Sequence, residues 1–219
     1  MKPLAIKICG VTTPADAELA VDAGATHVGL NFVPSSRRFV DRERAKAIAA
    51  AVRGRVVVVG VVADLDDAAL LELACEGWLD ALQLHGDESA DAFNALAFGA
   101  AIPLWKAVRV GERGDLARAD AYASSLVVDA KVEGELGGTG RRADWELAAE
   151  LARERPVWLA GGLTPENVAE AVAAVRPFGV DVASGVEMQT AQGPRKDPGR
   201  VYAFVAAARA AAAKLTSSG

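Results

Sequence analysis

The sequence predicts an α/β fold, a (β/α)8 TIM barrel built as a single domain over residues 1–219. Three observations predict it. Short β-branched runs alternate eight times with Ala-rich amphipathic stretches, which is the order of a parallel sheet wound with helices. A length of 219 residues suits one barrel of this kind. No linker, low-complexity block or charge run divides the chain.

The eight expected strands are short runs rich in valine, isoleucine and leucine. Parallel strands have this composition because both of their faces are covered. In chain order they are LAIKICG (4–10), THVGLNF (26–32), VVVVGVVA (56–63), DALQLH (80–85), IPLWKAV (102–108), SLVVDA (125–130), PVWLAG (156–161) and VDVASG (180–185).

Each expected helix follows one strand and is amphipathic. Thr13 and Thr164 each precede a proline, which predicts two helix N-caps, and Gly24 predicts a glycine C-cap. In chain order the helices span residues 14–24, 41–52, 66–75, 88–97, 114–123, 143–154, 164–175 and 197–213.

Charge and composition argue against a nucleic-acid-binding protein and against a membrane-spanning one. The chain has 24 basic and 29 acidic residues, a net charge of −5, and no basic block that would bind nucleic acid. The most apolar run, residues 56–63, is far too short to span a bilayer. Two cysteines far apart and the absence of a secretory leader favour a reducing, cytoplasmic location.

The alternative fold is a doubly wound open sheet, whose first strand should lead into a Gly-rich dinucleotide turn. Here the first strand leads into GVTTP instead. In a barrel the active site lies at the carboxyl ends of the strands. The residues that end strands are therefore the candidates for function.

Glycines after the last two strands predict a phosphate site. Gly161 and Gly162 lie where the seventh strand ends, and Ser184 and Gly185 lie where the eighth ends. Such turns let backbone N–H groups approach a phosphate beside a helix N-terminus, and a serine adds a hydroxyl donor. The Gly-rich loop that contains Gly138 either closes over the same group or is a surface loop, and composition does not decide between them.

Several segments together resemble the phosphoribosylanthranilate isomerase family of tryptophan biosynthesis. They run in the family's order from residue 7 to about residue 198. The pairing of KICG with a strand-ending aspartate and GGTG is the specific part, because the two glycine turns are shared by many phosphate-binding barrels. The segments are KICG, GLNFVPSSRRFV, LQLHGDES, VVDA, GGTGRRADW, LAGGLTPENV and VDVASGVE before KDP.

The resemblance implies an aldose–ketose isomerase that catalyses an Amadori rearrangement of a small phosphosugar, N-(5-phosphoribosyl)anthranilate. It implies Cys9 as the base, Asp129 as the acid, and no metal or organic cofactor. Arg38 matches the arginine that binds the anthranilate carboxylate, and Arg37 takes its place if the alignment shifts by one residue. A guanidinium suits that role because it binds a carboxylate through two hydrogen bonds.

Further residues are expected to line or support the site. Gln83 and His85 share one face at the end of the fourth strand, where His85 is either a pocket residue or a structural histidine. Lys7 shares a face with Cys9, and a buried ammonium needs a partner. Asp181 in the eighth strand, counted among the substrate-binding residues, is the expected partner across the seam that closes the barrel.

Residues 188–195 are longer than the corresponding stretch of the family and follow the phosphate turn directly. They are expected to alter a lid or the start of the last helix. A monomer and a homodimer are both compatible with the sequence. Rival functions are two related phosphosugar enzymes, the histidine-pathway aldose–ketose isomerase and indole-glycerol-phosphate synthase, or a non-catalytic phosphate-binding protein.

Overall fold

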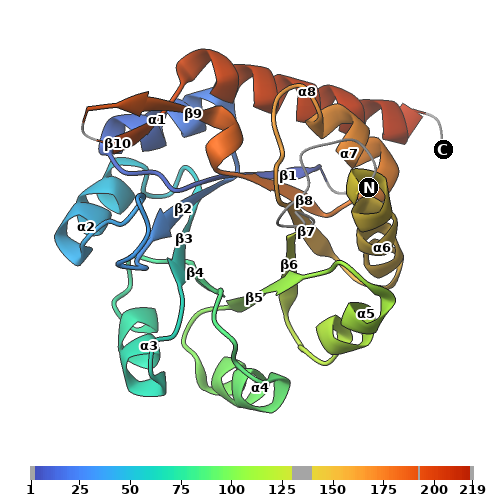
Figure 1. The fold of residues 1–219 in the computed structure, drawn as a ribbon. Coiled ribbons are helices and arrows are strands. Elements are labelled where there is room, and N and C mark those ends of the chain that lie inside the picture. Colours follow the sequence, from blue (N-terminus) through green and yellow to red (C-terminus); the bar gives the residue numbers. More distant parts are fainter. Residues whose placement is uncertain (1–2, 130–139, 192, 218–219) are drawn as a thin grey trace.

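A computed structural model describes residues 3–129, 140–191 and 193–217, and its eight parallel strands form one closed barrel (Figure 1). Each strand is hydrogen-bonded to the next, and β8 returns to β1, which confirms the predicted fold class. The strands are β1 (Ala5–Cys9), β2 (His27–Asn31), β3 (Val57–Val62), β4 (Ala81–Leu84), β5 (Leu104–Arg109), β6 (Ser125–Asp129), β7 (Val157–Ala160) and β8 (Gly179–Val182).

One helix follows each strand, and the helices surround the barrel (Figure 1). They are α1 (Pro14–Ala23), α2 (Arg42–Ala51), α3 (Asp67–Ala74), α4 (Ala90–Gly99), α5 (Arg113–Asp120), α6 (Gly140–Glu154), α7 (Val168–Val175) and α8 (Pro198–Ser217). Within the described part of the chain, no helix combines the length and the apolar character needed to cross a membrane.

The first helix has the ends that its sequence predicts. The Thr13 hydroxyl accepts a hydrogen bond from the backbone N–H of Asp16, and Gly24 ends the helix at φ 95°. The expected start of the seventh helix at Thr164 is wrong. There, the side chain of Asn167 accepts a hydrogen bond from the backbone N–H of Thr164. Residues 164–167 form a turn, and α7 begins after it, at Val168.

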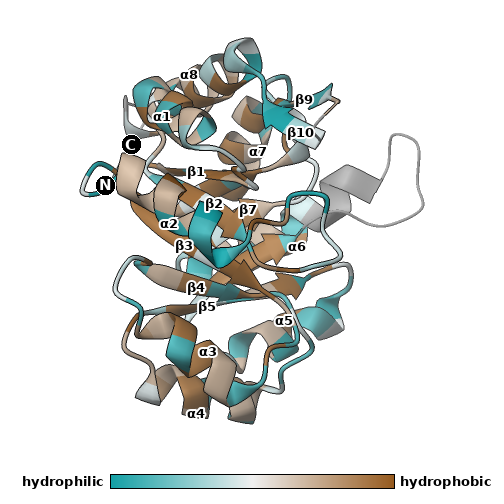
Figure 2. Cartoon of the chain, turned by 90° about the vertical axis from the view of Figure 1, so that its left-hand side faces the viewer, coloured by the Kyte–Doolittle hydropathy of each residue, from teal (hydrophilic) through white to brown (hydrophobic). Residues whose placement is uncertain are grey.

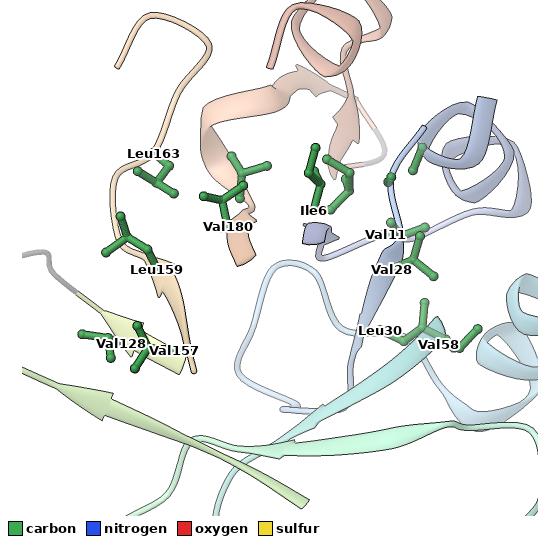
Figure 3. Packing of buried hydrophobic residues seen from close by; sticks show 14 of the residues in the cluster. Ile6, Val11, Val28, Leu30, Val58, Val128, Val157, Leu159, Leu163 and Val180 are labelled. Atoms are coloured by element: carbon green, nitrogen blue, oxygen red, sulfur yellow. The ribbon is translucent and has the colours of Figure 1, made fainter. Parts of the chain in front are cut away.

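The strands bury side chains on two faces. Residues such as Val28, Val128, Leu159 and Val180 point outward and pack under the helices, as Figure 3 shows. A smaller cluster fills the barrel interior from the alternate positions. Figure 2 shows the strands mostly in hydrophobic colours between helices that carry hydrophilic patches. The interior cluster comprises Ala5, Val59, Ala81, Trp105, Val127 and Trp158.

Aromatic rings close the amino-terminal end of the barrel interior. Trp105 and Trp158 stack with ring centroids 5.1 Å apart, and His27 meets Trp158 edge-on at 4.7 Å. Such aromatic pairs add about 0.5–1.5 kcal/mol beyond their burial. Burial and the nearby charge of Lys7 lower the pKa of His27 to about 4, so this ring is neutral near pH 7.

The lowered pKa of His27 predicts a stability loss in mild acid. Between about pH 6.5 and pH 4 the unfolded chain binds a proton at this residue that the folded chain excludes, so stability falls as the pH falls. We expect His27→Asn, which keeps a partner for the Thr26 hydroxyl, to lose less stability over this range than the unaltered chain. Urea unfolding at pH 7 and pH 4.5 measures the difference, and parallel losses would contradict it.

A two-stranded hairpin connects the last barrel strand, β8, to α8 along the chain. It consists of β9 (Glu187–Thr190) and β10 (Gly193–Lys196), and it follows a short 3-10 helix, η1 (Ser184–Val186). Figure 1 shows it beside α1, to which it is tied by an ion pair between Arg195 and Asp16. The long stretch after the eighth strand therefore forms an antiparallel ribbon that leads into the last helix.

Candidate active site

Cys9 and Asp129 are each the last residue of a barrel strand. Cys9 ends β1 and Asp129 ends β6, so both lie at the carboxyl end of the barrel. Asp129 is in register with Arg109, the last residue of β5. Both candidates for proton transfer thus face the end at which barrels of this type place their chemistry.

Lys7 and Asp181 form the buried ion pair that the sequence predicts. The Lys7 ammonium donates to Asp181 Oδ2 at 2.8 Å, and β1 and β8 hold the two residues in register. The Lys7 side chain is 0% exposed. Burial lowers the pKa of Lys7, but Asp181 and the nearby Cys9 outweigh that effect, so the pKa is raised and the ammonium keeps its charge.

A glycine in β2 brings the thiol and the ammonium together. A Cβ atom at Gly29 would lie 2.7 Å from Cys9 Sγ and 3.1 Å from Lys7 Cε, which is too close for both. The absence of a side chain there leaves room for Cys9 above Lys7. Arg38 and Lys196 also interact electrostatically with Cys9. The pKa values of Lys7 and Arg38 are raised, whereas burial lowers the pKa of Lys196, so the thiol lies beside two cations that keep their charge and one buried lysine.

Gln83 and His85 meet as their shared face predicts. Gln83 Nε2 lies 2.5 Å from His85 Nε2. Burial, and then the charge of Lys7, lowers the pKa of His85, whose field also includes Asp129 and Asp181. His85 is therefore neutral near pH 7 and lies within electrostatic range of both the Lys7–Asp181 pair and Asp129.

Among the described residues, three buried side-chain oxygens lack a hydrogen-bond partner. Glu76 Oε1 lies outside the site and 2.8 Å from Arg42 Nη1, and the two within the site are Gln83 Oε1 and Asp181 Oδ1. Buried acceptors are nearly always paired, and each unpaired one costs about 1–3 kcal/mol. Hydroxyl groups of a polar ligand would satisfy both oxygens. This supports the placing of Gln83 and Asp181 among the substrate-binding residues.

A cavity of about 470 Å³ opens beside His85 and Asp129. Its wall includes Lys106 and Arg109, which were not among the predicted site residues. Lys106 is nearly buried and donates to Glu88 at 2.7 Å and to the carbonyl of Gly86 at 2.5 Å. Both residues belong to β5, which carries no distinctive motif at its end, so their place in a strand was the only sign in the sequence that they line the site.

Arg38 lies over the end of β1 and contacts an acidic residue of the hairpin. Its Nε and Nη2 atoms donate to the two carboxylate oxygens of Glu187 at 2.6 and 2.9 Å. Arg37 reaches the same carboxylate but is 52% exposed, against 20% for Arg38. Glu187 and Lys196 were not predicted as site residues, although both belong to segments that carry the family resemblance.

The two glycine turns meet at the ends of β7 and β8. Gly161 and Gly162 have φ angles of 87° and 63°, a region that favours glycine. A Cβ atom at Gly185 would lie 1.9 Å from the carbonyl oxygen of Leu163, so the second turn packs directly on the first. Ser184 begins the 3-10 helix at this contact. Gly138 lies outside the described residues.

A larger cavity, about 920 Å³, lies at the opposite end of the barrel. Its wall includes Pro3 and Leu4, which precede β1, together with Phe178, which precedes β8. None of the predicted site residues contributes to it. Because barrels of this fold carry their chemistry at the carboxyl ends of the strands, the smaller cavity is the one that belongs to the candidate site.

Comparison with known proteins agrees with this geometry. The profile of the family described as N-(5'phosphoribosyl)anthranilate (PRA) isomerase matches residues 6–207. A protein named N-(5'-phosphoribosyl)anthranilate isomerase from Roseiflexus castenholzii is 46% identical over 217 residues, covering 94% of this chain and 99% of the relative. A Pseudomonas fluorescens protein of the same name is 45% identical over 207 residues, covering 93% and 94%.

Solved structures give the same result. Phosphoribosyl anthranilate isomerase from Thermotoga maritima has a TM-score of 0.84 and 36% identity, and covers 94% of this chain and 99% of that chain. Another structure of such an isomerase has a TM-score of 0.81 and 33% identity over the same shares. That protein is in complex with reduced 1-(o-carboxyphenylamino)-1-deoxyribulose 5-phosphate.

Proposed function

The chain belongs to the N-(5'-phosphoribosyl)anthranilate isomerase family, and from this premise we propose how its residues catalyse the isomerisation. The substrate, N-(5-phosphoribosyl)anthranilate, becomes 1-(2-carboxyphenylamino)-1-deoxyribulose 5-phosphate in tryptophan biosynthesis. The observation that carries the assignment of roles is the placing of Cys9 and Asp129 at the same end of the barrel, with Cys9 beside the positive charges of Lys7 and Arg38.

Asp129 acts first, as the acid. It protonates the ribose ring oxygen while the bond from that oxygen to C1 breaks, and the anilinic nitrogen supplies the electron pair that forms a protonated imine. Cys9 then takes the C2 proton, and the C2–H electron pair forms the C1–C2 double bond. The resulting enaminol gains a proton at C1 and loses its hydroxyl proton to become the ketone. The imine nitrogen accepts the electrons, so the reaction needs no metal or organic cofactor.

Lys7 supports the base. Its ammonium is buried beside Cys9 and is held by Asp181, and a positive charge beside a thiol favours the thiolate, which is the form that accepts a proton. The neutral ring of His85 adds no competing positive charge to the pocket. Lys7 is therefore a supporting residue that acts through Cys9.

The substrate spans the carboxyl end of the barrel. Arg38 binds the anthranilate carboxylate, and the turns at Gly161–Gly162 and Ser184–Gly185 bind the phosphate. Asp181 Oδ1 and Gln83 Oε1 accept hydrogen bonds from ribose hydroxyls, which supplies the partners that these buried oxygens lack among the described residues.

The ligand is accordingly a small phosphosugar rather than a nucleic acid or a membrane. The protein acts in the cytoplasm as a single-domain enzyme, either as a monomer or as a homodimer. One of the solved Thermotoga maritima structures is of monomers generated from a dimeric isomerase. Sedimentation of the purified chain at micromolar concentration separates the two states.

The natural fluorescence of phosphoribosylanthranilate gives a direct test. We expect its fluorescence to decay on addition of the protein far faster than in buffer, and a rate equal to the uncatalysed one would refute the function. The substrates of the histidine-pathway isomerase and of indole-glycerol-phosphate synthase are the matched controls. Preferred turnover of either one would assign the chain to that rival activity instead.

A further inference from the structure

Glu187, which has no role in the proposed mechanism, is a buried carboxylate surrounded by three basic side chains. Its side chain is 2% exposed and accepts hydrogen bonds from Arg38, Arg37 and Lys196. Burial raises the pKa of Glu187, but Arg38 and Lys196 outweigh that effect and the pKa is lowered, so the carboxylate is ionised near pH 7.

The contact with Glu187 leaves three of the five N–H donors of Arg38 available. Glu187 binds one edge of the group, through Nε and one proton of Nη2. A guanidinium has five N–H donors, so both protons of Nη1 and the second proton of Nη2 remain at its outer end. That end presents the second pair of parallel donors, which can bind another carboxylate through two hydrogen bonds.

A buried lysine of the hairpin, Lys196, holds the carboxylate of Glu187 in place. Lys196, opposite Glu187 in the hairpin, is 1% exposed and donates to Glu187 at 3.0 Å. The same ammonium donates to the carbonyl of Cys9 at 2.6 Å and to the carbonyl of Ala183 at 3.2 Å. The carboxylate that orients Arg38 is thus connected through one lysine to the ends of β1 and β8.

The other side of Arg38 rests on backbone. A Cβ atom at Gly10 would lie 2.2 Å from Arg38 Cδ, so the arginine side chain crosses the residue after Cys9 in direct contact. Gly10 has a φ of 70°, which also favours glycine. Arg38 is therefore held on two sides, with Gly10 beneath its stem and Glu187 along one edge.

We propose that Glu187 is a positioning residue, which fixes Arg38 by its Nε edge so that the outer end of the guanidinium receives the anthranilate carboxylate. The proposal deepens the proposed function and rests on it. Preorganisation of this kind improves substrate binding because an unrestrained arginine must lose rotamer freedom when it binds. The hairpin that carries Glu187 and Lys196 is therefore part of the binding machinery.

Steady-state kinetics of Glu187→Ala, Glu187→Gln and Arg38→Ala test the proposal. Hydrogen bonds to charged groups contribute amounts that correspond to about tenfold or more in affinity. We expect both alanine variants to raise KM about tenfold or more, with kcat changed less. Glu187→Gln keeps one acceptor for Arg38 and should recover part of the loss. An unchanged KM in Glu187→Ala would overturn the proposal, and so would a lowered KM, because Glu187 would then compete with substrate for Arg38.

Binding of two ligands distinguishes a positioning role of Glu187 from general structural damage. One ligand is the reduced product analogue, and the other is the same compound without the carboxylate on its aromatic ring. We expect Glu187→Ala to weaken binding of the first about tenfold or more and of the second little, by calorimetry. Equal weakening of both would overturn the proposal. Asp22→Asn, which removes an exposed ion pair with Arg55, should change neither affinity.

The binding measurement also tests the role of Glu187 separately from the proposed isomerase activity. If the unaltered chain shows no turnover but distinguishes the two ligands, the proposed function fails while the role of Glu187 is still measured. Circular dichroism melting of each variant shows whether it folds. Should Glu187→Ala fail to fold because it leaves Lys196 with an unpaired charge, Glu187→Gln carries the same comparison, with a loss of selectivity for the carboxylated ligand as the expected result.

Discussion

Replacement of Asp129 by asparagine is expected to lower kcat about 10²- to 10⁴-fold, the usual contribution of general acid–base catalysis. Asparagine keeps the size of the side chain but has no acidic proton to give to the ribose ring oxygen. Cys9→Ala should have an effect of similar size, because alanine has no group to accept the C2 proton. Both variants should change KM less than kcat, since neither side chain is assigned to hold the carboxylate or the phosphate.

The decay of substrate fluorescence under saturating conditions measures both losses. Cys9→Ser is the matched control for shape, because a hydroxyl of similar size is a far weaker base than a thiolate, and it should be nearly as slow as Cys9→Ala. Full activity in Cys9→Ala would show that another group is the base. Full activity in Asp129→Asn would remove the acid assignment, with Arg109 and His85 as the neighbouring groups to examine next.

Lys7→Met is expected to lower the free energy of unfolding by about 3–5 kcal/mol, the typical cost of removing one member of a buried ion pair. Methionine fills much of the volume of the lysine stem, so the loss comes mainly from Asp181, whose only described hydrogen-bond partner is the Lys7 ammonium. Activity should also fall, because Cys9 loses the positive charge of Lys7, which lies beside it in β1. Urea unfolding at pH 7 measures the stability change.

The double variant Lys7→Met with Asp181→Leu is the control for the ion pair. Replacing both charges by apolar groups leaves no buried charge unpaired, so its stability should exceed that of Lys7→Met alone. Its activity should stay low, because both the supporting charge and the ribose acceptor are gone. Additive losses in the double variant would show that the two residues are not energetically coupled in the folded protein.

The order of the elements follows from the sequence because each is encoded locally. The second strand, expected at residues 26–32, is β2 (His27–Asn31), and the first helix, expected at 14–24, is α1 (Pro14–Ala23). The Lys7–Asp181 pair was also predictable. Alternation along a strand determines which side chains face inward, and closure of a barrel makes the first and last strands neighbours.

The hairpin and its charges were not predictable in the same way. The strands β9 and β10 have four residues each, and their pairing depends on contacts with distant parts of the chain, such as Arg195 with Asp16. Short segments of this kind carry little periodicity of their own. The role of Lys196 was hidden for the same reason, since its partners at Cys9 and Ala183 are adjacent only after the barrel has closed.

The bond between Lys7 and Asp181 joins residues 174 positions apart along the chain. During synthesis, the segment with Cys9 and Lys7 leaves the ribosome early, while the carboxylate of Asp181 that pairs with the lysine arrives near the end. Pairing across such a separation is slow to form, because a long loop must close before any contact rewards it. A nascent or truncated chain that lacks β8 therefore has the thiol that we propose as the base but lacks the carboxylate that pairs with Lys7. For this enzyme, the first appearance of activity should report that the last strand has docked.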